Sequence, residues 1–106
     1  MERKDTKDID LDELKRQRKA FKEQTEEEDL NLQTRIQKTI DGCEMLGVRN
    51  TRLRMMLEDS VHEMRRQRQR LLSSRDDFLD HMDRRIRTLE DEKEELRRKE
   101  RDAAQT

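Results

Sequence analysis

The apolar residues of this chain recur three, four or seven positions apart over most of its length, and no proline interrupts them. Such a stripe lies on one face of an α-helix and is typical of a helix that packs against partner helices. Its members are Leu32, Ile36, Ile40, Cys43, Leu46, Leu53, Leu57, Val61, Met64, Leu71, Phe78, Met82, Ile86, Leu89 and Leu96. The sequence therefore predicts an all-α fold. It consists of one long coiled-coil helix (a rod), either straight or kinked, with no compact core of its own.

Composition supports a helix and excludes an ordinary globular domain. Half of the 106 residues are charged and only 28% are hydrophobic, whereas globular domains contain roughly 45–50% apolar residues. The 26 basic and 27 acidic residues sum to −1, so self-repulsion is weak. The lack of proline and the many Arg, Glu, Leu, Lys, Gln and Met residues favour a helix over a disordered chain. We expect its apolar stripe to be buried against other helices.

Local signals divide the chain into four expected segments. Asp10, with Glu13 three residues later, resembles a helix start. The acidic tract 25–29 fits either a break or a solvated face of a continuing helix, and we favour continuity because neither Gly nor Pro intervenes. The segments are a frayed polar N-terminus (1–9), a short amphipathic helical segment (10–29), a coiled-coil helix (30–101) and a frayed C-terminus (102–106).

The only two glycines, Gly42 and Gly47, lie close together inside the coiled-coil segment. Each costs roughly 1 kcal/mol in a helix interior relative to alanine. They fit either a kink at 42–47 or a turn that folds the chain into a hairpin. We favour the kink, because Cys43, Met45 and Leu46 are too apolar for an exposed loop.

Several positions of the apolar stripe are polar. They are Asn50, Arg68 (or Gln67), Arg75 and Lys93. A tight homodimeric zipper tolerates few such residues. We therefore expect other coiled-coil proteins as partners, and a hetero-oligomer rather than a homodimer, with the partner supplying the opposite charges.

Charge is segregated along the chain. Residues 1–30 carry a net charge of −3, residues 31–75 of +5, and residues 76–106 of −3. This pattern fits pairing of acidic ends with basic middles, or docking to an acidic polymer surface such as a microtubule. Nucleic acid is a weaker candidate, because no stacking aromatic lies in the basic tract. The arginines that could contact an acidic partner are Arg49, Arg52, Arg54, Arg65, Arg66, Arg68, Arg70 and Arg75.

Residues able to perform chemistry are few. His62 and His81 are far apart on a helix, and Cys43 has no histidine near it in sequence. We expect no catalytic residue, cofactor or metal site. No apolar run approaches the ~20 residues of a membrane span, and the N-terminus is too charged for a signal peptide. We expect an intracellular protein of the cytoplasm or cytoskeleton, including the cilium, with the nucleus as second choice.

Together these features predict a non-enzymatic structural or scaffolding coiled-coil subunit of a larger multiprotein assembly. The composition and heptads over residues 30–100 are similar, in a general way, to those of small axonemal, centrosomal and kinetochore coiled-coil proteins. We therefore expect a cytoskeletal assembly, whether microtubule, axonemal or ciliary, centrosomal or kinetochore. The alternatives are a membrane-trafficking tether or SNARE-like helix, and a nucleic-acid-associated zipper protein.

Overall fold

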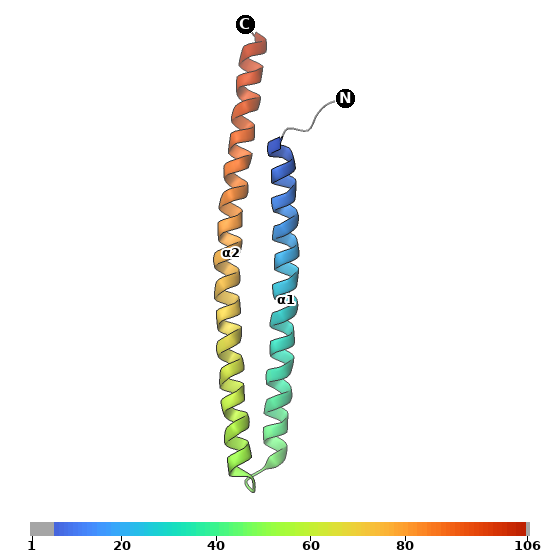
Figure 1. Cartoon of the computed structure of the whole chain (residues 1–106), viewed down its shortest axis with the longest axis vertical. Coiled ribbons are helices and arrows are strands. Elements are labelled where there is room, and N and C mark those ends of the chain that lie inside the picture. The colour runs from blue at the N-terminus through green and yellow to red at the C-terminus, as the bar shows by residue number, and fades with distance from the viewer. Residues whose placement is uncertain (1–5, 106) are drawn as a thin grey trace. The chain divides into compact units, whose positions relative to one another are not determined.

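The structure is a computed structural model and describes residues 6–105, with side chains from residue 8. This part of the chain consists of two long α-helices joined by a short turn. They are α1 (Thr6–Leu46) and α2 (Thr51–Gln105), and they pack antiparallel (Figure 1). The prediction of an all-α fold is confirmed. The prediction of one continuous helix is wrong, because the chain reverses direction between the two helices.

The reversal is produced by Gly47 and Asn50. Gly47 has a φ of 59°, a left-handed conformation that glycine adopts without the steric penalty of a Cβ atom. Its N–H donates to the carbonyl of Glu44 at 3.4 Å, the spacing found in a Schellman C-cap. The carbonyl of Asn50 accepts the N–H of Arg54 at 2.9 Å, as an N-cap residue does. Asn50 thus caps α2, which begins at Thr51, and is not a position of the apolar stripe.

A hairpin therefore forms at these residues, and the prediction of a kink is wrong. The turn needs only residues 47–50, so Leu46 remains within α1 and Met45 does not have to lie in a loop. The apolar residues that argued against a hairpin are outside the turn. Gly42 lies within α1 and does not interrupt it.

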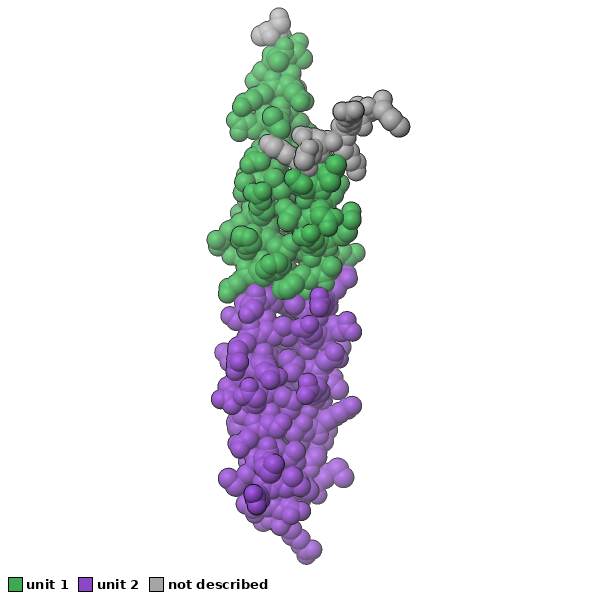
Figure 2. Space-filling model, viewed as in Figure 1, with its two compact units in different colours: residues 1–22, 77–106 green, residues 23–76 purple. Residues whose placement is uncertain are grey.

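The chain divides into two compact units (Figure 2). Unit 1 comprises Met1–Lys22 and Asp77–Thr106, and unit 2 comprises Glu23–Asp76. Unit 2 contains the turn and is a helical hairpin. Unit 1 is a pair of antiparallel helical segments.

Each unit has a thin apolar interior. In unit 2 the buried side chains are Cys43, Val61, Met64 and the polar Thr25, and in unit 1 they are Leu11, Met82 and Leu89. Unit 1 also contains the Phe21 and Phe78 rings, whose centroids are 4.4 Å apart at a tilt of 54°. No side chain of the described residues is less than 2% exposed. Two helices alone cannot surround a side chain, so water reaches every position of these interiors.

The helix bounds can be compared with the expected segments. α1 continues through residues 25–29, which confirms the expected continuity, and it already includes residues 6–9. α2 includes residues 102–105. Residues 1–5 and 106, which belong to the segments expected to fray, lie outside the described residues. Neither helix of the described chain is long and apolar enough to cross a membrane.

Candidate interaction surfaces

Arg68 and Asp29 join the helices of unit 2. Arg68 Nε and Nη2 lie 2.6 and 3.4 Å from the two carboxylate oxygens of Asp29. Gln33 Nε2 donates to the same carboxylate at 2.8 Å. The Asp29 side chain is only 14% exposed, and the hydrogen bond from Arg68 holds the pKa of Asp29 below its usual range. The forked guanidinium matches a carboxylate at two points, so the contact fixes geometry as well as charge.

A second arginine of the predicted stripe is also paired within unit 2. Arg75 Nη2 lies 3.4 Å from Glu26 Oε1. The Arg75 side chain is 19% exposed, and Glu26 is half exposed. The acidic tract of α1 thus lies opposite the arginine-rich tract of α2.

Unit 1 repeats this arrangement with different residues. Arg18 on α1 makes a two-point contact with Asp83 on α2, at 2.5 and 3.3 Å. The hydrogen bond between them raises the pKa of Arg18 and lowers that of Asp83. Lys93 pairs with Asp8, and Lys15 pairs with Glu90 at 3.2 Å.

The three charged positions of the stripe therefore have partners in the same chain. Arg68, Arg75 and Lys93 contact Asp29, Glu26 and Asp8 respectively. The sequence alone could not identify these carboxylates as the partners, because they lie opposite the three basic side chains only when the helices form an antiparallel hairpin. The polar positions consequently no longer argue that a different protein must supply the opposite charges.

The eight arginines proposed to contact an acidic partner differ in their surroundings. Arg54 pairs with Glu58, and both Arg66 and Arg70 contact Glu63. Arg68 and Arg75 pair across the helices as described above. Among the described residues, only Arg49, Arg52 and Arg65 of the eight have no ionic or hydrogen-bonding partner for the side chain. All three are exposed, and all three belong to unit 2.

The apolar residues of the predicted partner-helix stripe also fall into three groups. Cys43, Val61, Met64, Met82 and Leu89 are buried. Leu53, Phe78 and Leu96 are exposed. The half-buried ones are Leu32, Ile36, Ile40, Leu46, Leu57, Leu71 and Ile86. Much of the stripe therefore faces the other helix of the same chain, and the half-buried members leave part of their apolar surface uncovered.

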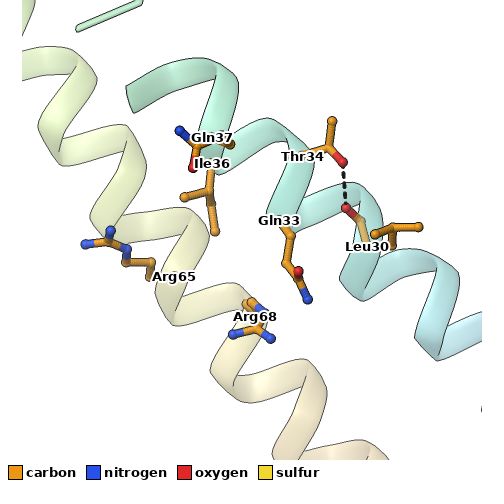
Figure 3. A pocket seen from close by; sticks show the side chains of 7 residues that line it. All are labelled: Leu30, Gln33, Thr34, Ile36, Gln37, Arg65 and Arg68. Atoms are coloured by element: carbon orange, nitrogen blue, oxygen red, sulfur yellow. Dashed lines mark hydrogen bonds between the residues drawn. The ribbon is translucent and has the colours of Figure 1, made fainter. Parts of the chain in front are cut away.

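A groove follows one side of unit 2, between its helices. One depression is lined by Leu30, Gln33, Thr34, Ile36 and Gln37 of α1, and by Arg65 and Arg68 of α2 (Figure 3). Next to it lies a second depression, lined by Ile40, Cys43, Glu44, Arg54, Glu58, Val61, His62 and Arg65. Arg65 lines both depressions, so they are neighbours along unit 2, and together they are called the unit 2 groove below.

Apolar side chains are exposed to solvent at the end of unit 2 that contains the turn. Met45 is 88% exposed and Val48 is 86% exposed. Met55 and Met56 at the start of α2 are 59% and 61% exposed. These four residues form the apolar tip. Flexible methionines suit an adaptable contact surface.

Two residues with reactive side chains line the groove. Cys43 and His62 line the same depression although they belong to different helices, a proximity that sequence spacing did not reveal. The Cys43 thiol lies 3.8 Å from the carbonyl of Arg54. His81 lies in unit 1, away from them in sequence and in another unit. Among the described residues, no three His, Cys, Asp or Glu side chains are grouped so that they could hold a metal ion.

Comparison with protein families, with curated proteins and with solved structures finds nothing that matches this chain. The groove, the apolar tip and the three arginines without a partner among the described residues are therefore the features of this chain that bear on its function.

Proposed function

We propose that this chain is a non-enzymatic structural or scaffolding subunit of a larger assembly, and that it works by packing its helices against other coiled-coil helices. The observation that carries the proposal is the apolar tip. Met45 and Val48 are almost fully exposed, although only 28% of the residues of this chain are hydrophobic. Exposed apolar clusters mark protein interaction sites.

Two of the three unpaired arginines lie close to this tip in sequence. Arg49 is in the turn, and Arg52 is near the start of α2. An apolar surface beside unpaired arginines suits an acidic protein surface with apolar pockets. This combination favours the cytoskeletal version of the proposal, in which the tip contacts an acidic lattice such as the microtubule, in the cytoplasm or the cilium.

A pair of matched variants tests the proposal in the cell of origin. The tagged chain would be purified with its partners and compared with a tip variant, Met45→Gln, Val48→Gln, Met55→Gln and Met56→Gln. The control variant is Ile9→Gln, which replaces an exposed apolar residue of unit 1 outside the predicted stripe. We expect coiled-coil subunits of a cytoskeletal assembly with the wild type and the control, and their loss from the tip variant.

Two results would contradict the proposal. Recovery of nucleic-acid-bound proteins, sensitive to nuclease, would favour a zipper that acts on nucleic acid. Recovery of membrane-trafficking components would favour a tether. Co-sedimentation of the purified chain with microtubules, weakened by salt and by Arg49→Gln with Arg52→Gln, separately tests the lattice contact.

A further inference from the structure

The unit 2 groove carries two unpaired charges of opposite sign. Arg65 and Glu44 both line it. Neither side chain has a hydrogen bond or ion pair with any described residue. The other charged residues in the groove are internally compensated: Arg54 pairs with Glu58 at 3.4 Å, and Arg68 pairs with Asp29.

The two unpaired charges lie at different heights along the groove. Contacts across unit 2 join Asp29 with Arg68 and Cys43 with Arg54. This antiparallel register places Arg65 level with residues 32–36 of α1. Glu44 lies about ten residues further toward the turn, which corresponds to about 15 Å along a helix at ~1.5 Å per residue.

We propose that this groove packs against the same groove of a second copy of the chain, in a twofold-symmetric antiparallel dimer in which Arg65 of each copy faces Glu44 of the other. A twofold interface must be complementary to itself, because the same surface is used by both copies. A groove with one unpaired cation and one unpaired anion, separated along its axis, meets that requirement when two copies run in opposite directions.

The apolar residues of the groove fit the same arrangement. Ile40 lies midway between the heights of Arg65 and Glu44, so the twofold axis would bring the two Ile40 side chains together. In the single chain Ile40 and Ile36 are only half buried. A second hairpin would add two helices to the two of unit 2 and would complete their burial in a four-helix bundle.

The proposal extends the proposed function, since such a dimer would be the form that enters a larger assembly. Its test needs only the purified full chain. Failure to dimerise would remove this inference and leave the co-purification experiment to decide the proposed function.

Sedimentation equilibrium with charge-reversed variants tests the dimer. We expect the wild type to be dimeric at micromolar to several hundred micromolar concentration. Arg65→Glu and Glu44→Arg each place like charges opposite one another twice per dimer, so each should raise the dissociation constant about tenfold or more. The double variant restores both pairs with reversed sign, and its affinity should return toward that of the wild type.

Matched controls lie on the other side of unit 2. Glu28 and Arg35 line a depression there, so Glu28→Arg and Arg35→Glu make the same charge changes outside the proposed interface. They should remain dimeric, and circular dichroism should show unchanged helicity in all variants. A monomeric wild type, an additive loss in the double variant, or a loss of the dimer only in the control variants would each overturn the proposal.

Discussion

Arg68 and Asp29 tie α2 to α1 through a two-point contact, with Arg68 Nε 2.6 Å from Asp29 Oδ1. Arg68 is 38% exposed, so solvent weakens the contact, and we expect Asp29→Asn to lower the free energy of unfolding by about 1 kcal/mol. Urea unfolding followed by circular dichroism measures the change. Asp59→Asn is the control, because Asp59 is exposed and has no partner among the described residues. Equal effects of the two substitutions would show that the cross-helix contact does not stabilise the hairpin.

The same pair makes stability depend on pH. The hydrogen bond from Arg68 lowers the pKa of Asp29. The Asp29 carboxyl therefore releases its proton more readily in the folded chain than in the unfolded chain. The stabilisation is fully present above the unfolded pKa of about 3.9 and is lost as pH falls through the lower folded pKa. We therefore expect the stability difference between wild type and Asp29→Asn to shrink below about pH 4. A difference that stays constant from neutral pH down to the acid limit would contradict this assignment.

The two glycines should respond in opposite directions to alanine. Gly47 has a φ of +59°, where an alanine costs about 1 kcal/mol or more. Gly42 lies inside α1, and a Cβ there would meet nothing within 4 Å, so Gly42→Ala should stabilise by about 0.5–1 kcal/mol. Thermal unfolding of the two variants, measured in parallel, checks the signs. Stabilisation by Gly47→Ala would indicate that the helix continues through this position.

The Phe21 and Phe78 rings, with centroids 4.4 Å apart, should be coupled in unit 1. A double-mutant cycle with Phe21→Leu and Phe78→Leu should give an interaction free energy of about 0.5–1.5 kcal/mol. The control cycle pairs Phe21→Leu with Leu96→Ala, whose effects should add. Additive effects in the phenylalanine cycle would mean that the rings do not stabilise the pairing of the helices.

The sequence was sufficient to predict helices, because heptad spacing and the absence of proline leave few other folds. It was not sufficient to predict the hairpin. Gly42 and Gly47 have equivalent intrinsic preferences, and only the cap at Gly47, followed by Asn50 three residues later, distinguishes a turn from a kink. That Gly–Asn spacing was the missed signal.

The polar positions of the stripe show the same limit. Arg68 and Arg75 could be recognised as stripe positions by their spacing alone. Their partners Asp29 and Glu26 are 39 and 49 residues distant, and no local pattern connects them. The chain reversal decides which acidic residues lie opposite. A kink at this point would leave Arg68 and Arg75 without these partners, and a different protein would then have to supply the opposite charges.

The distance between Gln24 and Ser74 tests the central claim, that the chain folds back on itself at residues 47–50. Both residues are exposed and belong to unit 2. Spin labels would be attached in a Gln24→Cys, Ser74→Cys, Cys43→Ala variant and diluted with unlabelled Cys43→Ala chains, so that double electron–electron resonance reports distances within one chain. Packed helices have axes about 10 Å apart, so the hairpin should give a distance under about 30 Å with both labels included. A single uninterrupted helix would separate the two positions by about 75 Å, and that result would contradict the account.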